Sequence, residues 1–377
     1  MPTPSRTAAP PPDAPRIAIA HEWLVRYAGS ERVVEELTGA FAVERILTTV
    51  LERDAMPAAL EVAEPSWLQH VPGATAHHEW LLPLMPLAWR LRQPVRDVDA
   101  VVSSSHACAN AVRVGAGIPH VSYCHTPMRY AWDFASEQAR FPAALRPAAR
   151  AAMGLFRRWD RSQAEGVTRF VANSTAVAER IRRAYGRDAD VVFPPVRTDH
   201  FTPDATAERS RFLFVGRLVA YKRPDLVIEA FRGLDHELVV VGEGQLRREL
   251  SSSAPPNVSF LESVDDEGLR RLYRESIALV YPAEEDFGIV MAEAQACGTP
   301  VIALDKGGAV DIVEDGITGW LIHDQDVQQL RRAVRHAAET PLDPVEIAAA
   351  TQRFAAGHFR EQMQRIVRET IESGSPG

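Results

Sequence analysis

The sequence has few cysteines and no long run of apolar residues. Cys108, Cys124 and Cys297 are far apart and form no CxxC pair, which argues against a disulfide framework and against a structural zinc site. The most apolar stretch, residues 80–89, is about half the length of a membrane span and contains two prolines. The first 15 residues lack the apolar core of a signal peptide, so we expect a cytoplasmic protein.

Basic residues are outnumbered by acidic ones, and lysine is almost missing. The 377 residues carry 42 basic and 50 acidic side chains, a net charge of −8 that argues against general nucleic-acid binding. Only two of the basic residues, Lys222 and Lys306, are lysines, so arginine fills most positions where any cation would serve. The length suggests two domains at about 150 residues each.

Short β-branched runs alternate with helical stretches along most of the chain. Such near-continuous apolar runs are typical of parallel strands that are buried on both faces. The pattern occurs twice and predicts an α/β fold of two Rossmann-like, doubly wound domains that face a central cleft, with ligands outside the carboxyl ends of the strands. Strands are expected at 16–20, 45–50, 99–104, 120–124, 169–173, 211–216, 236–242, 258–261, 277–281 and 300–304.

A proline-containing stretch, VVFPPVRTDHFTPD, separates the two halves and has no helical period. We therefore expect a disordered tail at 1–15, an N-terminal domain at 16–200 and a C-terminal domain at 201–345. The remaining segment, 346–377, has a helical pattern with no strand after it.

The strongest motif is AEEDFGIVMAEAQACGTPVIA, which follows the apolar run IALVY. Glu285 and Glu293 bracket Phe287, Gly288 and Ile289. A helix that begins near Phe287 would present backbone N–H groups to anionic or hydroxyl oxygens, and Gly288 would let a ligand approach the main chain. The combination suits a polyhydroxyl ligand that carries phosphates. Glu285 taken alone is equally explained as an acid stabilised by the helix dipole.

The second motif is FVGRLVAYKRPD, in which cations follow a strand. The strand is expected to end at Gly216, Arg217 leaves its carboxyl end, and Lys222 comes just before a proline that favours the first turn of a helix. An arginine fork and a lysine point charge at such a place can hold a diphosphate. The alternative interpretation is a solvated surface.

Two weaker signals lie in the first half. His125 follows directly after the run HVSYC, so we expect it at the carboxyl edge of the sheet. Gly29 precedes a helix that opens at Glu31, where backbone amides can meet a phosphate or a sugar. This loop is neither GxGxxG nor a P-loop, and no HExxH or GxSxG string occurs, which disfavours dehydrogenase, zincin and α/β-hydrolase functions.

These strings resemble glycosyltransferase family 4, the retaining nucleotide-sugar transferases with the two-domain GT-B fold. The resemblance covers nearly the whole chain after residue 15. It rests on the two glutamates around FGIVMAEAQACGTPVIA, on GRL followed by Lys222, and on VVVGEG. AGSERVVEEL and SYCHTPMRYAWD are similar to a subgroup that includes bacterial polysaccharide mannosyltransferases. Ser30 departs from the pattern, since many members have a second glycine there.

The resemblance implies a role for each candidate side chain. Arg217 and Lys222 would hold the donor diphosphate and stabilise its charge as the sugar leaves. Glu285 would orient hydroxyls of the transferred sugar, and Glu293 would bind the ribose. His125 would contact the transferred sugar from the opposite domain.

The backbone would supply further donor contacts. The resemblance implies that amides around Phe287, Gly288 and Ile289 contact sugar and phosphate. Gly29 would lie near the diphosphate, and Gly216 would line the donor site.

The resemblance also implies the reaction and the division of labour between the domains. The 16–200 domain would serve the acceptor, the 201–345 domain would bind the nucleotide sugar, and 346–377 would cross back to the first domain. The implied activity is retaining transfer of a hexose, with mannose from GDP-mannose as our first choice, to a glycan or lipid-linked acceptor in cell-surface polysaccharide biosynthesis, without a metal or cofactor. A UDP-sugar-dependent transferase and a non-catalytic nucleotide-sugar-binding protein are the alternatives.

A basic stretch, RFPAALRPAARAAMGLFRRWDR at 140–161, holds six arginines and one acid with apolar and aromatic residues between them. Such a stretch can dock on anionic lipid, which would place the protein at the inner face of the cell membrane near a lipid-linked acceptor. An arginine-rich solvated helix is the equally weighted alternative.

Overall fold

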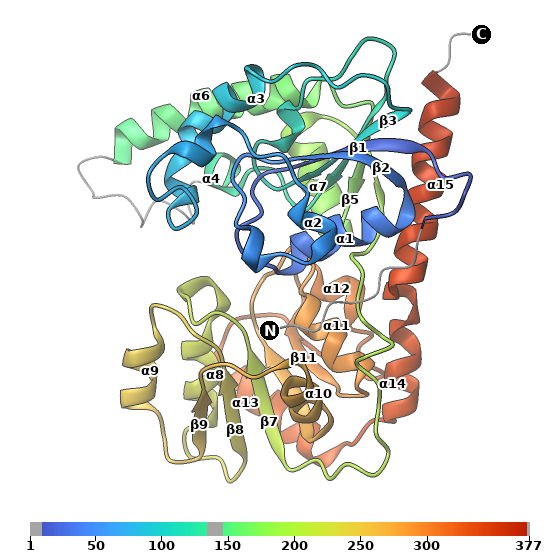
Figure 1. The fold of residues 1–377 in the computed structure, drawn as a ribbon. Helices are drawn as coiled ribbons and strands as arrows, with labels where there is room; N and C mark the ends of the chain where they lie inside the picture. Colours follow the sequence, from blue (N-terminus) through green and yellow to red (C-terminus); the bar gives the residue numbers. More distant parts are fainter. Residues whose placement is uncertain (1–9, 134–145, 375–377) are drawn as a thin grey trace. The chain divides into compact units, whose positions relative to one another are not determined.

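The computed structural model describes residues 10–133 and 146–374, which divide into two compact units (Figure 1). The chain passes from the N-terminal to the C-terminal unit between Phe193 and Pro194, and returns to the N-terminal unit between His358 and Phe359. Each unit contains a six-stranded sheet in which every pairing is parallel. The prediction of two Rossmann-like α/β domains is therefore confirmed.

The unit boundaries differ from those predicted from the sequence. Residues 194–200 and 346–358, which we assigned to the N-terminal domain and to the crossing segment, belong to the C-terminal unit. The two segments pair with each other, since the Val196 N–H donates to the Phe354 carbonyl at 2.8 Å. They also contact the rest of the C-terminal unit: Arg197 forms a 2.8 Å ion pair with Asp266, and Phe354 packs on Phe287.

The N-terminal sheet has the strand order β2-β1-β3-β4-β5-β6. All of its strands run in the same direction, so their carboxyl ends meet at one edge. The strands are β1 Arg16–His21, β2 Ala42–Leu47, β3 Ala100–Ser105, β4 His120–Cys124, β5 Arg169–Ala172 and β6 Ala189–Val191.

The C-terminal sheet has the order β12-β11-β10-β7-β8-β9. Its strand order reverses between β7 and β10, and ligands of such sheets bind outside the carboxyl ends at this switch point. The strands are β7 Arg211–Val215, β8 Glu237–Val241, β9 Val258–Leu261, β10 Ser276–Tyr281, β11 Val301–Leu304 and β12 Gly319–Ile322.

Two edge strands, β6 and β12, and the position of β2 were not predicted correctly. β2 begins at Ala42, three residues before the expected 45, and β6 has only three residues. β12 begins with Gly319, a residue that disfavours strands. A Cβ at position 319 would lie 2.1 Å from the Val301 carbonyl oxygen, so close pairing with β11 requires glycine there. Tertiary pairing overrides propensity at these short edges.

Helices cover both faces of each sheet (Figure 1). None of the helices within the described ranges combines the length and hydropathy of a membrane span. The α-helices are α1 Gly29–Ala40, α2 Ala58–Glu61, α3 Met85–Arg90, α4 Arg129–Trp132, α6 Arg146–Ala164, α7 Thr175–Tyr185, α8 Pro224–Phe231, α9 Arg247–Ser253, α10 Asp266–Arg274, α11 Ile289–Ala296, α12 Ala309–Ile312, α13 Val327–Glu339, α14 Pro344–Ala350 and α15 Ala356–Gly374.

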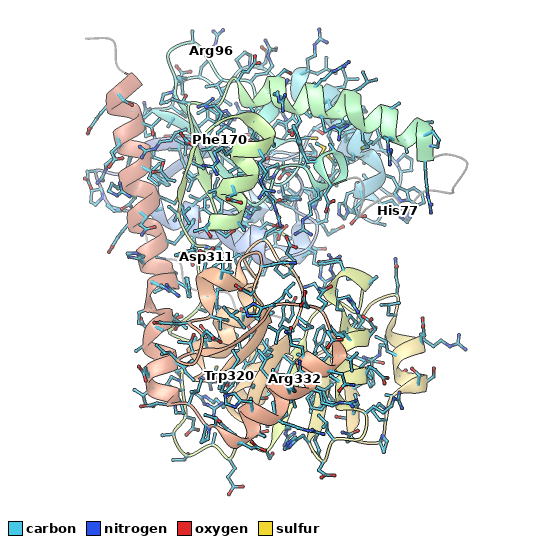
Figure 2. All side chains as sticks on the ribbon, turned by 180° about the vertical axis from the view of Figure 1, so that it is seen from behind. His77, Arg96, Phe170, Asp311, Trp320 and Arg332 are labelled. Carbon is cyan, nitrogen blue, oxygen red and sulfur yellow. The ribbon has the colours of Figure 1, made fainter. Side chains whose placement is uncertain are left out.

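The core of the N-terminal unit lies on the two faces of its sheet. Ile17 and Ile19 of β1 pack with α1 and α15, whereas Ala18 and Ala20 pack on the opposite face with α3. This alternation follows from the two-residue period of a strand. Phe170 of β5 is labelled in Figure 2. Its ring stacks on Tyr185 of α7, with ring centroids 5.5 Å apart.

Helix α15 packs on the N-terminal unit through an apolar face. Phe359, Met363, Ile366 and Val367 are all buried in the same cluster as β1. The Arg360 guanidinium adds an ion pair to Glu36 of α1 at 2.5 Å. The predicted helical segment is not continuous, because α14 and a short 3-10 helix precede α15.

Part of the expected disordered tail is structured. Residues 1–9 lie outside the described residues, but the Ala14 N–H donates to the Pro11 carbonyl in a turn. Asp13 pairs with Arg368 of α15 at 3.0 Å, and the Pro15 carbonyl accepts from Ala42. Proline restricts the backbone of such a segment in advance, which lowers the entropy lost on ordering it.

We predict that Met363→Ala destabilises the N-terminal unit. The side chain is fully buried, so its truncation should lower the free energy of unfolding by about 2–5 kcal/mol. Urea unfolding followed by circular dichroism measures the change. Glu372→Ala on the exposed end of the same helix is the matched control and should stay within about 0.5 kcal/mol. Equal stabilities of the Met363→Ala variant and the wild type would contradict this docking.

Candidate active site

The C-terminal unit brings three of the predicted site residues together at the carboxyl edge of its sheet. Lys222 ends a 3-10 helix, Ala220–Lys222, that follows β7, and Glu285 lies in the loop after β10. Lys222 Nζ lies 3.0 Å from Glu285 Oε1. A Cβ at Gly216 would lie 3.5 Å from Lys222 Nζ, so the lysine head group covers the end of β7. The two motifs, to both of which the resemblance assigns donor contacts, therefore lie together.

Tyr281, which sequence reasoning missed, links the two charges. Lys222 Nζ donates to the Tyr281 hydroxyl at 2.7 Å, and that hydroxyl donates to Glu285 Oε1 at 2.9 Å. Burial and the neighbouring Glu285 carboxylate raise the pKa of Tyr281 well above its ordinary value, so the hydroxyl keeps its proton. The signal was available, since Tyr281 is the last residue of the strand run that precedes the glutamates.

Arg217 joins this cluster through Tyr221. Its Nη2 lies 3.5 Å from the Tyr221 hydroxyl, and Lys222 Nζ lies 5.8 Å from the centre of the Tyr221 ring. Arg217 is exposed, whereas the Lys222 side chain is only 14 % exposed. The two cations thus flank one aromatic side chain, with the lysine inside and the arginine outside.

The helix start after Glu285 differs in detail from our expectation. Helix α11 begins at Ile289, two residues after Phe287, and Gly288 caps it with a left-handed φ of 92°. The Phe287 side chain is buried against Phe354, with ring centroids 5.5 Å apart, so this residue can offer a ligand only its backbone. Glu293 is also buried, and its Oε2 lies 3.4 Å from the Tyr273 hydroxyl.

A glycine pair that was not predicted, Gly307-Gly308, packs against the loop that carries Glu285. The Gly308 N–H donates to the Glu285 carbonyl at 2.9 Å. A Cβ at Gly307 would lie 2.3 Å from that same carbonyl oxygen, and one at Gly308 would lie 2.3 Å from Phe287 Cα. Because no side chain fits, the pair sets the backbone course from Glu285 to Phe287. Contacts between distant loops of this kind leave no local sequence signal.

In the N-terminal unit the structure places Gly29 and His125 at the carboxyl edge of the other sheet. Gly29 is the first residue of α1, and a Cβ there would meet nothing within 4 Å, so the backbone is open on that side. Glu31 closes the turn by accepting from the Ala28 N–H at 3.1 Å. His125 follows β4 directly, and its Nε2 lies 2.8 Å from Ser104 Oγ at the end of β3.

A buried carboxylate, Glu22, organises this edge. Its Oε1 accepts from the Ser105 hydroxyl and from the backbone N–H groups of residues 106, 107 and 109, at 2.8–3.0 Å. Burial alone would raise the pKa of Glu22, but His106, His21 and these donors lower it to about 2. Glu22 is therefore ionised at neutral pH and holds the loop after β3 in place.

Two family models match the chain and meet near the unit boundary. Residues 27–200 match the model described as Glycosyltransferase Family 4, and residues 196–354 match the model described as Glycosyl transferases group 1. Together the matches take in the loop around Gly29, His125, the cations after β7 and both glutamates.

Curated relatives and solved structures resemble the chain. It is 30% identical over 260 residues to the D-inositol 3-phosphate glycosyltransferases of Mycobacterium tuberculosis H37Rv and Mycobacterium bovis AF2122/97, with 55% of this chain and 54% of each relative covered. The chain thus spans about half the length of the curated relatives it matches. The resemblance to mannosyltransferases is not tested by these relatives and stays a prediction.

The structural matches cover almost the whole chain. Sucrose-phosphate synthase from Thermosynechococcus elongatus matches with a TM-score of 0.71 and 19% identity, covering 95% of this chain and 100% of that one. Anabaena Alr3699/HepE in complex with UDP and glucose matches with a TM-score of 0.67 and 19% identity, covering 94% and 99%. At this identity the likeness shows the fold.

We predict that Glu22 makes the N-terminal unit acid-sensitive. Its pKa is about 2 when folded, against an ordinary value of 4.5, so the stabilisation is complete above about pH 4.5 and is lost as the pH falls towards 2. The loss should be roughly 2–4 kcal/mol. Urea unfolding across this range should show a steep fall for the wild type and a shallower one for Glu22→Gln.

The exposed Glu44 of β2 provides the control for this titration. Glu44→Gln should keep the wild-type slope of stability against pH. If Glu22→Gln also kept it, the ionised carboxylate would not be what holds the loop after β3.

Proposed function

We propose that the chain is a glycosyltransferase that transfers a hexose from a nucleotide sugar, since its two parts match the Glycosyltransferase Family 4 and Glycosyl transferases group 1 models. The observation that carries the proposal is the Lys222–Tyr281–Glu285 cluster beside Gly216. A cation and a carboxylate at the switch point of a Rossmann-like sheet suit a ligand that joins a diphosphate to a hydroxylated ring.

In this proposal Lys222 serves the leaving group. Its ammonium has three donors, and two face Tyr281 and Glu285, which leaves the third for a phosphate oxygen. Breaking the sugar–phosphate bond places negative charge on the diphosphate. A cation already held at that place stabilises the charge without reorganisation. Arg217 would meet the same diphosphate from the exposed side of Tyr221.

The glutamates would hold the rest of the donor. Glu285 Oε1 faces Lys222 and Tyr281, so Oε2 would accept from a hydroxyl of the transferred sugar. Glu293 would accept from the ribose, where burial strengthens each hydrogen bond that forms. Backbone amides around Gly288 and Ile289 would contact sugar and phosphate.

The stereochemistry and the acceptor belong to the same proposal. We propose retention, with the acceptor attacking the face from which the diphosphate departs and a phosphate oxygen taking the hydroxyl proton. Arg217 and Lys222 would supply the charge compensation, so the reaction would need no metal. The acceptor would be a glycan or lipid-linked sugar in polysaccharide biosynthesis.

The donor decides between the candidate functions. We propose GDP-mannose, with UDP-glucose and UDP-N-acetylglucosamine as the alternatives, and expect the true donor to raise the melting temperature because it binds only the folded protein. Thermal-shift assays with each compound measure this. A larger shift with a UDP-sugar would replace GDP-mannose, and no shift with any of them would contradict the proposed transferase.

A non-catalytic binding protein is distinguished by turnover. It would show the thermal shift but would not cleave the donor. Incubation of the protein with the stabilising nucleotide sugar, followed by assay of the released nucleoside diphosphate, separates these two functions.

We predict that Lys222→Ala lowers turnover about a hundredfold or more, the scale of losing one positioned charge in an active site. Lys222→Arg should recover part of the activity because the charge remains. Arg248→Ala on the exposed face of α9 is a control for loss of one cation and should keep wild-type turnover. Release of nucleoside diphosphate from the donor measures all three. Near wild-type activity of Lys222→Ala would rule out the diphosphate role.

We also propose that the N-terminal unit docks on anionic membrane, through α6 of the expected stretch together with a second, apolar segment. Residues 140–145 of the predicted basic stretch lie outside the described residues. In α6 the aromatic side chains Phe156 and Trp159 pack inward on the core, and Leu155 is 65% exposed among the arginines. Helix α6 therefore contributes mainly charge to such a surface.

Apolar contact would come from the segment that contains α3. The exposed apolar residues there are Trp80, Leu84, Leu87 and Leu91. Trp80 is 78% exposed and stacks on His77, which is labelled in Figure 2. This segment and α6 pack on the same core cluster through their buried sides. Exposed aromatic and aliphatic groups next to arginines are the combination that favours a lipid interface.

Vesicle flotation tests this docking. We predict that the protein floats with vesicles of phosphatidylglycerol and phosphatidylcholine but not with pure phosphatidylcholine, and that Trp80→Ala weakens flotation. Val345→Ala, which removes an exposed apolar group from the C-terminal unit, should not. Equal flotation with and without phosphatidylglycerol would contradict the proposed docking.

A further inference from the structure

A chain of polar side chains in the N-terminal unit connects the start of α1 with His125. Glu31 Oε1 lies 3.6 Å from His21 Nε2, and His21 Nδ1 lies 3.2 Å from Ser104 Oγ. Ser104 Oγ lies in turn 2.8 Å from His125 Nε2. His21 and Ser104 are completely buried, and no motif in the sequence pointed to either.

The donor and acceptor at each contact in this row of side chains can be assigned, because His21 carries a proton on Nδ1. This nitrogen lies 2.9 Å from the backbone carbonyl oxygen of Ser104, which can only accept a hydrogen bond. Burial alone would lower the pKa of His21, but the carboxylates of Glu31 and Glu22 outweigh it and raise the pKa. In either the neutral or the charged ring, Nδ1 is therefore a donor.

The Ser104 hydroxyl then acts as a hydrogen-bond donor to His125. Its oxygen faces the Nδ1–H of His21, so it accepts there, and its single hydrogen is left for His125 Nε2. Burial, with His106 and His21 close by, lowers the pKa of His125 to about 3, so the ring is neutral at neutral pH. A neutral ring whose Nε2 accepts must carry its proton on Nδ1.

The rings around His125 hold its orientation. Tyr123 and His106 meet it edge-on, with centroids 5.2 and 6.1 Å away. His106 itself faces Glu22 Oε2 at 3.3 Å through its Nδ1.

We propose that His21 and Ser104 are positioning residues that keep His125 in the Nδ1–H tautomer, so that His125 offers a hydrogen-bond donor to a sugar oxygen. The contact with sugar rests on the proposed function, whereas the tautomer does not. Two consequences follow: His125 Nε2 is occupied and cannot act as a base, and Glu31 couples the loop at Gly29 to the same histidine.

Nitrogen NMR of the whole protein labelled with ¹⁵N-histidine tests the tautomer without any substrate. Long-range proton–nitrogen correlations distinguish the protonated from the unprotonated ring nitrogen, and the His125 signals are those lost in His125→Asn. We expect His125 to be neutral and protonated on Nδ1 at neutral pH. A proton on Nε2, or on both nitrogens, would overturn the proposal from the wild-type spectrum alone.

The structure provides a matched pair of serines on β3. Ser103 Oγ lies 2.8 Å from His120 Nε2, the same distance as between Ser104 and His125. Ser104→Ala should shift His125 away from the pure Nδ1–H form and leave His120 unchanged, whereas Ser103→Ala should do the reverse. Ser104→Thr, which keeps the hydroxyl, should restore the wild-type spectrum. If Ser103→Ala and Ser104→Ala changed the His125 tautomer equally, Ser104 would not be the residue that sets it.

The kinetics of donor cleavage test whether His125 contacts the sugar. With the nucleotide sugar that stabilises the protein, Ser104→Ala should lower kcat about tenfold, the size of one misplaced hydrogen bond, with the donor KM changed less than about twofold. Unchanged kcat beside a shifted tautomer would overturn the sugar contact. A wild type that binds and cleaves no nucleotide sugar would instead contradict the proposed function, while the spectra would still decide the tautomer.

Discussion

The parallel direction of the strands is the constraint on which the candidate residues of each unit depend. In each sheet the carboxyl ends meet at one edge, so side chains from distant parts of the chain gather there. Lys222 and Glu285 are 63 positions apart but share a 3.0 Å ion pair for this reason. His21, Ser104 and His125 come together at the other sheet in the same way.

Buried charge is stabilised in different ways at the carboxyl edges of the two sheets. In the C-terminal unit the Lys222 ammonium, the Tyr281 hydroxyl and the Glu285 carboxylate form one cluster, and the lysine side chain is 14% exposed. In the N-terminal unit Glu22 is fully buried and is stabilised by four donors on one oxygen, so its charge serves the loop. The first cluster pairs a cation with a carboxylate, and the second fixes the loop after β3.

Backbone packing also shapes the loop that carries Glu285. The Gly307-Gly308 pair fits against Glu285 and Phe287 where any Cβ would collide with the main chain. The left-handed Gly288 turns the chain into α11. These contacts set the position of the glutamate carboxylate before any ligand arrives, which is the kind of preorganisation that electrostatic catalysis requires.

The sequence by itself determined the two α/β domains, the helical character of the terminal segment and the positions of Lys222 and Glu285 after strands, because hydrophobic period and strand-end position are local properties. Only the tertiary structure decided the edge strands β6 and β12, the unit boundary, the burial of Phe287 and Glu293, and the parts played by Tyr281, Glu22 and Ser104. Each of these depends on contacts between segments far apart in the chain, and such contacts leave no periodic trace in the residues that make them.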